Sequence, residues 1–143
     1  MNKTHRVLLC DDQDMVRFII REILNQYAPD VEVVGEASGG EAGTAAALKL
    51  LPDLVLMDVL MPDLDGFEAT RQIVKASSVK VLAHSSLTDW DAVDQMFEAG
   101  ACGYVLKQGD PRELVRAIRI VLADGFFLSP GLMASPTPVE EER

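Results

Sequence analysis

The sequence predicts a doubly wound α/β domain built on a five-stranded parallel sheet. Short apolar runs alternate along the chain with longer segments of helical periodicity, which is typical of repeated βα units. Two of these runs, at 54–57 and 80–84, are almost continuously apolar, as expected for strands that are buried on both faces. A chain of 143 residues suits one domain of this kind and can bury a proper core.

Five segments are predicted to form the strands of the sheet. In chain order they are 6–10, 31–37, 54–57, 80–84 and 103–106. Crossover connections between parallel strands are right-handed, which leaves few topologies. The strand order 2-1-3-4-5 of a flavodoxin-like fold is the one that brings the ends of strands 1, 3, 4 and 5 together.

Five helices are predicted between and after these strands. The first follows Asp14 as its N-cap and buries a face made of Val16, Ile19, Ile20 and Ile23. The next three cover about 40–51, the residues after Gly66, and about 89–99. Their alternation with the strands completes five βα units.

The fifth helix has the clearest boundaries. Asp110 stands at its N-cap, Pro111 at its first position and Gly125 just past its end. Residues 1–128 are therefore assigned to one domain. Residues 129–143, which end in prolines and glutamates, are expected to be a disordered tail or the start of an interdomain linker.

Composition argues against several classes of protein. The formal net charge of -10 opposes direct binding to DNA, and no basic cluster offsets it. No secretory leader and no apolar run near the ~20 residues of a membrane span is visible, so a cytoplasmic protein without membrane contact is expected. Cys10 and Cys102 lack the spacing of a metal or redox site and are expected to be buried free thiols.

Side chains that could carry chemistry stand at the ends of four strands. They are Asp11 and Asp12 after the first, Asp58 after the third, Ser85 after the fourth and Lys107 after the fifth. The ends of the central strands of an open parallel sheet converge on one crevice. Phosphoryl transfer needs a nucleophile, a divalent cation and further positive or donor groups, and a carboxylate is a known acceptor. We therefore predict one phosphorylation site with Asp58 as the nucleophile.

The acidic residues of this site also predict a metal. Three carboxylates close together repel one another, and a hard cation with oxygen ligands, such as Mg²⁺, neutralises them. Asp11, Asp12 and Asp58 are the candidate ligands. Taken singly, each has an ordinary alternative as a solvated loop acid or a capping aspartate, and Lys107 has one as a surface charge.

Four motifs, in this order, resemble the receiver domain of bacterial two-component response regulators, which has the CheY-like fold. They are V-L-L-C-D-D-Q, D-L-V-L-M-D-V-L-M-P-D-L-D-G-F-E, V-L-A-H-S-S and E-A-G-A-C-G-Y-V-L-K. The resemblance covers about residues 5 to 125. The segment I-V-L-A-D-G-F-F-L-S-P is similar to the end of NarL/LuxR receivers, which continue into a helix-turn-helix DNA-binding domain. That domain is absent from this chain, and whether the natural protein continues past Arg143 stays open.

The resemblance implies a signalling domain, and not a conventional enzyme, that a sensor histidine kinase phosphorylates on Asp58. Asp12 and Asp58 would bind Mg²⁺ directly, and Asp11 would act through water. The backbone carbonyl of Leu60 would supply a third protein ligand. The domain would assist its own phosphorylation and dephosphorylation, and would regulate transcription through a DNA-binding output.

The resemblance also implies the residues of a switch. Lys107 would pair with the acceptor carboxylate and later with its phosphoryl oxygen. Ser85 occupies the position of the switch hydroxyl. Tyr104 matches an aromatic residue whose inward or outward orientation accompanies the switch, although an ordinary half-buried tyrosine is the alternative.

Three other classes fit the residues less well. An aspartyl-phosphate hydrolase has a second acid two positions after its nucleophile, where this chain has Leu60. A nucleotide-binding module has a glycine-rich loop whose spacing the glycines at 35–43 do not match. A degenerate receiver used only as a scaffold would lack the acid, the hydroxyl or the lysine, and all three are present.

Two apolar residues predict slow loss of the phosphoryl group. Leu60 and Leu87 stand two positions after the acceptor and the switch hydroxyl, where the resemblance puts the approach of hydrolytic water. Leucine cannot orient that water by a hydrogen bond. The alternative is that other groups set the rate and Leu60 only packs.

Apolar residues off the core faces predict a homodimer. Phe18 falls away from the core face of the first helix, and Ile120 falls opposite the core face of the fifth, made of Leu114, Ile118, Val121 and Leu122. The predicted topology makes these helices neighbours. A dimer contact through helices 1 and 5 is expected, with scattered surface apolar residues as the alternative.

Overall fold

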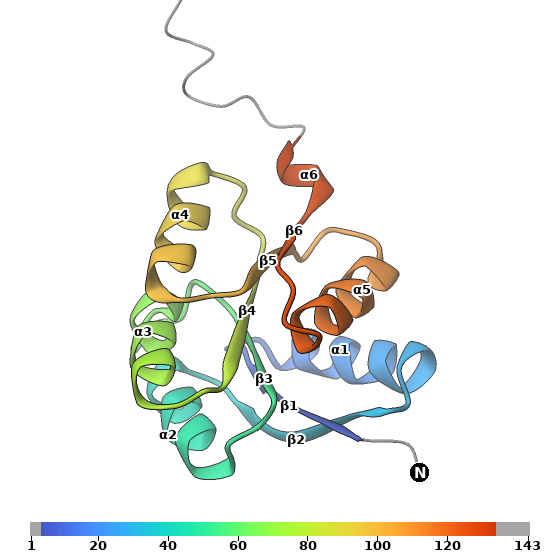
Figure 1. The fold of residues 1–143 in the computed structure, drawn as a ribbon, viewed down its shortest axis with the longest axis horizontal. Helices are drawn as coiled ribbons and strands as arrows, with labels where there is room; N and C mark the ends of the chain where they lie inside the picture. Colours follow the sequence, from blue (N-terminus) through green and yellow to red (C-terminus); the bar gives the residue numbers. More distant parts are fainter. Residues whose placement is uncertain (1–3, 134–143) are drawn as a thin grey trace, which may run out of the picture.

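The computed structural model describes residues 4–133 and has one parallel sheet between two layers of helices (Figure 1). Its strands are β1 (His5–Cys10), β2 (Val31–Ala37), β3 (Leu54–Met57), β4 (Lys80–Ser85), β5 (Gly103–Leu106) and β6 (Phe127–Leu128). Their order is β2-β1-β3-β4-β5-β6. The flavodoxin-like class and the order of the first five strands are confirmed. The predicted number of five strands is wrong, because β6 adds a short strand beside β5.

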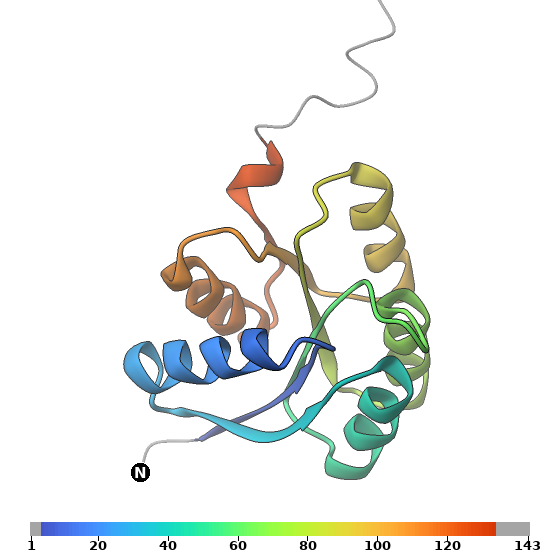
Figure 2. The same ribbon diagram turned by 180° about the vertical axis from the view of Figure 1, so that it is seen from behind.

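The helices divide between the two faces of the sheet. They are α1 (Asp14–Tyr27), α2 (Gly40–Leu50), α3 (Gly66–Ala76), α4 (Trp90–Ala99), α5 (Pro111–Leu122) and α6 (Pro130–Met133). Neighbouring α1 and α5 cover one face, and α2, α3 and α4 cover the other (Figures 1 and 2). The prediction of five helices is corrected to six among the described residues. Within 4–133, none of them has the length and apolarity needed to cross a membrane.

Side-chain caps explain where three helices begin. Asp65, Asp89 and Asp110 each accept a backbone N–H from the first turn of α3, α4 and α5. The first helix differs from the prediction, because Gln13 is its N-cap residue and Asp14 is already helical. The carboxylate of Asp14 instead forms an ion pair with Arg17 on the next turn.

Each face of the sheet supports its own core. Alternate residues of β1 and β3 face opposite sides, so Val7 and Leu56 pack with α1 and α5, whereas Leu8 and Val55 pack with α2 and α3. One residue of the predicted core is wrong, since Ile19 is 47% exposed. Ile20 and Leu24 are the fully buried residues of α1, and Ile19 lies at the edge of the buried face of this helix.

The chain after α5 packs onto the domain as far as Leu132, beyond the predicted boundary at 128. The backbone N–H of Ser129 donates to the carbonyl of Tyr104 at 3.0 Å, and Ser129 Oγ accepts from the N–H of Leu106 at 2.9 Å. Leu132 is completely buried and joins the core on the α2–α4 face. The rest of the predicted tail, 134–143, lies outside the described residues.

Candidate functional site

The parallel ladder continues past the strand ends and aligns the candidate residues at one edge of the sheet. The N–H of Asp58 donates to the carbonyl of Cys10 at 2.9 Å. The N–H of Lys107 donates to the carbonyl of Ser85 at 2.9 Å. Asp58 therefore lies beside the end of β1 and Lys107 beside the end of β4, so residues about a hundred positions apart in sequence meet at one edge of the sheet.

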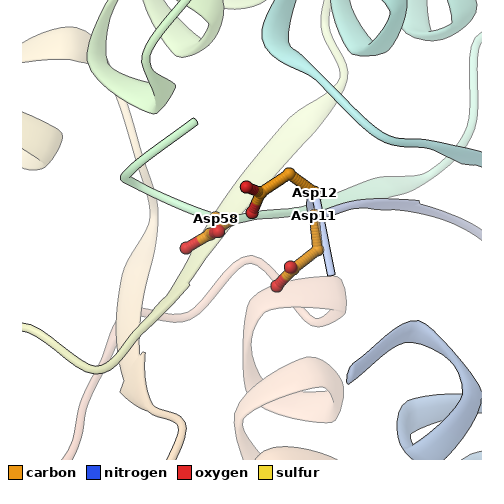
Figure 3. Close-up of side chains that lie close together, drawn as sticks. All are labelled: Asp11, Asp12 and Asp58. Carbon is orange, nitrogen blue, oxygen red and sulfur yellow. The ribbon is translucent and has the colours of Figure 1, made fainter. Parts of the chain in front are cut away.

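Three carboxylates gather at this edge, at the ends of β1 and β3 (Figure 3). One oxygen from each of Asp11, Asp12 and Asp58 lies within 4.8 Å of the other two. Asp11 and Asp58 are buried, with 3% and 5% of their surface exposed, and Asp12 is exposed. The cluster thus combines two buried carboxylates with one that is exposed to solvent.

Lys107 is the cation that faces the two buried acids. Its Nζ lies 2.8 Å from Asp11 Oδ2 and 3.4 Å from Asp58 Oδ1. Three carboxylates and one ammonium leave two negative charges. The pKa of Asp58 is raised to about 6, because burial and the nearby Asp11 carboxylate raise it and Lys107 only partly offsets them. The charged acceptor is therefore destabilised in the absence of a further cation.

The site has the donor set that a magnesium ion requires. Mg²⁺ prefers hard oxygen ligands and keeps several waters, which suits two buried acids beside one solvated acid. Asp11 Oδ2 is buried and forms a close ion pair with Lys107 Nζ at 2.8 Å. The two negative charges that Lys107 leaves uncompensated fit a divalent cation.

The acceptor loop, defined as residues 58–65 between β3 and α3, is closed by the backbone. The N–H of Gly66 donates to the carbonyl of Val59 at 2.8 Å. A Cβ at Gly66 would lie 2.2 Å from the carbonyl oxygen of Asp58, so only glycine fits this position. Leu60 is carried at the outside of the loop with 56% of its surface exposed.

The switch loop, defined as residues 86–89 between β4 and α4, follows the buried Ser85. The hydroxyl of Ser85 accepts the N–H of Leu87 at 3.1 Å. Tyr104 is fully buried on β5, and its hydroxyl donates to the carbonyl of Leu87 at 3.0 Å. Burial raises the pKa of this tyrosine. Tyr104 is thus oriented inward and touches the loop that carries the half-buried Leu87.

Two further residues shape the surroundings of the site, and sequence reasoning missed the contact made by the first. Asp63, inside one of the motifs, accepts the N–H groups of Gly40 and Glu41 at the start of α2. The signal for this contact is that α2 opens on two glycines and has no side chain of its own to cap it. His84 is buried, and its burial lowers its pKa to about 3 with help from Lys107, so its imidazole is neutral.

The two residues of the expected dimer contact differ from each other in exposure. Phe18 is 59% exposed on α1, beside the exposed Met15 and Ile19. Ile120 is only half-buried and packs against the α1–α5 core, because α5 turns it towards Gly125. The prediction that Ile120 lies opposite the core face is wrong. Phe18 therefore belongs to a continuous exposed apolar strip, and Ile120 does not.

Comparison with known proteins identifies the class to which this fold and acidic site belong. A family model of the response regulator receiver domain matches residues 7–119. The chain therefore belongs to the response regulator receiver domain family.

Several relatives resemble the chain over most of its length. The transcriptional regulatory protein LiaR of Bacillus subtilis is 45% identical over 115 residues, which cover 80% of this chain and 54% of LiaR. The response regulator protein VraR of Staphylococcus aureus is 42% identical over 117 residues, covering 81% and 56%. The chain thus spans just over half the length of these two relatives.

A solved structure supports the same assignment. The crystal structure of a LuxR-family two-component response regulator from Aurantimonas sp. SI85-9A1 matches with a TM-score of 0.86 at 36% identity. The match covers 92% of this chain and 94% of that one.

Proposed function

We propose that this receiver domain takes a phosphoryl group from a sensor histidine kinase onto Asp58 in the presence of Mg²⁺. The observation that carries the proposal is the cluster of three carboxylates with Lys107 Nζ at 2.8 Å from Asp11 and 3.4 Å from Asp58. A carboxylate oxygen of Asp58 attacks phosphorus, the P–N bond of a phosphohistidine breaks, and an aspartyl phosphate forms. The leaving imidazole keeps the electron pair.

Some residues around Asp58 would bind the metal ion, and Lys107 would stabilise the charge of the transferred group. Asp12, Asp58 and the carbonyl of Leu60 would hold Mg²⁺, with Asp11 acting through water. The bound ion supplies positive charge to the phosphoryl oxygens. Lys107 keeps Asp58 ionised and then stabilises the charge that spreads over the phosphoryl group.

The new phosphoryl group then acts as a switch. It brings a charge of about -1.5 to -2 at neutral pH. The Ser85 hydroxyl exchanges its contact with Leu87 for a phosphoryl oxygen, and Tyr104 holds its inward position as the switch loop rearranges. The switch loop with α4 and β5 is the element that this event biases.

The output that we propose is control of transcription through a DNA-binding domain outside this chain. LiaR, whose name calls it a transcriptional regulatory protein, supports this inference. The net charge of -10 makes the receiver itself unsuited to contact DNA. We place its action in the cytoplasm, where thiols such as Cys10 stay reduced.

We also propose a homodimer contact through α1 and α5. It is supported by the exposed Phe18 on α1, next to α5, whereas the half-buried Ile120 contributes less than expected. Sedimentation of Phe18→Glu should show loss of association, and addition of Ile120→Glu should add little. Unchanged association in the double variant ends the idea.

Labelling by acetyl phosphate tests the main proposal. The wild-type protein should gain one phosphoryl mass when Mg²⁺ is present and none when it is chelated. Asp58→Asn, which keeps the size of the side chain but removes the nucleophile, should gain none. A variant that is labelled at the wild-type rate would show that another residue is the acceptor.

A further inference from the structure

We propose that Asp63 is a positioning residue for the metal-binding side of the site, because it fastens the acceptor loop to the N-terminus of α2. The inference rests on the proposed function in one respect, namely that the carbonyl of Leu60 in this loop binds Mg²⁺. Asp63 itself does not belong to the acidic cluster. Its effect would be to hold Leu60, three positions away, in place.

The tie consists of two hydrogen bonds to adjacent backbone groups. Asp63 Oδ1 accepts the N–H of Gly40 at 3.0 Å, and Oδ2 accepts the N–H of Glu41 at 3.1 Å. The N-cap residue of α2, Gly39, offers no side chain, so these groups would otherwise lack a partner within the helix. Backbone hydrogen bonds from Leu64, Glu41 and Gly40 lower the pKa of Asp63, which keeps it ionised.

The two segments are also packed closely enough to fix their relative position. A Cβ on Gly39 would lie 2.8 Å from Asp63 Oδ1, and one on Gly40 would lie 2.0 Å from the carbonyl oxygen of Leu64. Real Cβ atoms do not approach so closely, so the glycines are what allows the contact. The acceptor loop therefore rests directly on the start of α2.

Other contacts hold the ends of the same loop but do not replace Asp63. The carbonyl of Val59 accepts from Gly66 at 2.8 Å, and Asp65 caps α3 by accepting from Glu68 at 2.9 Å. Both of these contacts join the loop to α3. Asp63 supplies the corresponding charged tie to α2, so the loop is held on two sides.

Magnesium binding makes the position of this loop matter. Mg²⁺ requires near-ideal octahedral geometry with oxygens at about 2.0 to 2.1 Å, so a small displacement of a carbonyl ligand weakens binding. Groups that orient metal ligands typically change the affinity about 10- to 100-fold when they are removed. Loss of the Asp63 tie should therefore weaken Mg²⁺ binding although no ligand is removed.

Calorimetric titration with MgCl₂ tests the proposal. Asp63→Ala should raise the Mg²⁺ dissociation constant about tenfold, at the low end of the effect of an orienting group. Asp63→Asn, which keeps one acceptor oxygen, should raise it less. Asp110→Ala is the matched control, because it also removes a helix cap, the bond to Arg112 at 2.8 Å, but outside the acceptor loop. Its dissociation constant should equal that of the wild type.

Amide exchange in the absence of metal gives an independent readout. The amide hydrogens of Gly40 and Glu41 should exchange faster in Asp63→Ala than in the wild type, and at the wild-type rate in Asp110→Ala. Gly40→Ala, which leaves Asp63 intact but forces the loop away, should weaken Mg²⁺ binding in the same way. It is the second variant if Asp63→Ala does not fold.

The outcomes separate this inference from the proposed function. If the wild type binds Mg²⁺ and Asp63→Ala binds it equally well, the positioning role is overturned while the proposed function stands. If Asp110→Ala loses the same affinity, the effect is general destabilisation and the role is also overturned. If the wild type itself neither binds Mg²⁺ nor is labelled on Asp58, the proposed function fails first.

Discussion

The acceptor loop and the switch loop leave the same edge of the sheet but are held very differently. The acceptor loop is tied to β1, α2 and α3 through Asp58, Asp63, Asp65 and its own closure at Gly66. The central contacts of the switch loop are the two made by Leu87, to Ser85 and to Tyr104. Asp89 also caps α4 by accepting from Ala92 at 3.3 Å, and the contact from Gln108 to Ser86 is 3.5 Å long.

This difference suggests that the acceptor loop keeps a fixed position while the switch loop changes its conformation. Metal binding and nucleophilic attack need preorganised oxygens, which a well-tied loop supplies. A response to phosphorylation needs an element with two arrangements, and such elements come from regions with few ties.

Removal of Lys107 should have the largest effect, because within residues 4–133 it is the one cation 2.8 to 3.4 Å from the buried acids. Lys107→Met keeps the apolar stem and removes the charge. Loss of one such stabilising group typically lowers the rate by about 100- to 1,000-fold. The initial rate of labelling by acetyl phosphate at saturating Mg²⁺ measures the effect. A loss of less than threefold would contradict the role of Lys107.

The raised pKa of Asp58 makes the stability of the metal-free protein depend on pH. Its folded pKa of about 6 lies above the ordinary value of 3.8, so the fold favours the protonated acid. The resulting stabilisation is complete below about pH 4 and is lost as the pH rises through about 6. Two pKa units correspond to about 3 kcal/mol at most.

Urea unfolding in the presence of a chelator measures this dependence. The advantage of Asp58→Asn over the wild type should grow between pH 4 and pH 7, in the direction set by the raised pKa of Asp58. Added Mg²⁺ should reduce it. If the unfolding free energies of the wild type and of Asp58→Asn depend on pH in the same way, the site does not destabilise the ionised form of Asp58.

Leu60 tests whether the fixed loop also protects the phosphoryl group. Its side chain is 56% exposed at the outer side of the acceptor loop and offers no hydrogen bond to water. Leu60→Asn should speed loss of phosphate about 10- to 100-fold, which corresponds to about 1.4 to 2.8 kcal/mol of barrier. The decay of phosphorylated protein at constant Mg²⁺ is measured. Leu87→Asn, on the switch loop, provides the comparison. If Leu60→Asn loses phosphate at the same rate as the wild type, or more slowly, Leu60 does not protect the phosphoryl group.

Tyr104→Phe should have the smallest effect of the series. It removes only the hydrogen bond to the carbonyl of Leu87 and leaves the buried ring in place. Such a bond contributes about 0.5 to 1.5 kcal/mol. The switch loop should exchange its amide hydrogens faster, and the acceptor loop should not change. Equal acceleration in both loops would show that Tyr104 stabilises the domain as a whole.

The parts of the fold that follow local patterns were predictable from the sequence. Continuous apolar runs located β3 and β4, and the polar residues that follow the strands located the acidic cluster, because parallel strands end at a common edge. The tie between Asp63 and α2 joins segments 23 positions apart and depends on two glycines that allow close approach. Periodicity contains no signal for such a contact.

The remaining errors arise from tertiary packing. Helical periodicity cannot tell which side of a broad apolar face is buried, and this decides the exposure of Ile19 and Ile120. The short β6 and α6 are stabilised by the edge of β5 and by burial of Leu132. Isolated segments of two and four residues have no propensity strong enough to predict them.

Amide hydrogen exchange of the two loops, with and without Mg²⁺ and the phosphoryl analogue beryllofluoride, tests whether the acceptor loop is fixed while the switch loop rearranges. The acceptor loop should exchange slowly in the free protein and change little when the analogue binds. The switch loop should exchange rapidly in the free protein and become protected as Ser85 engages the analogue. Strong new protection of the acceptor loop, with no change in the switch loop, would contradict the account.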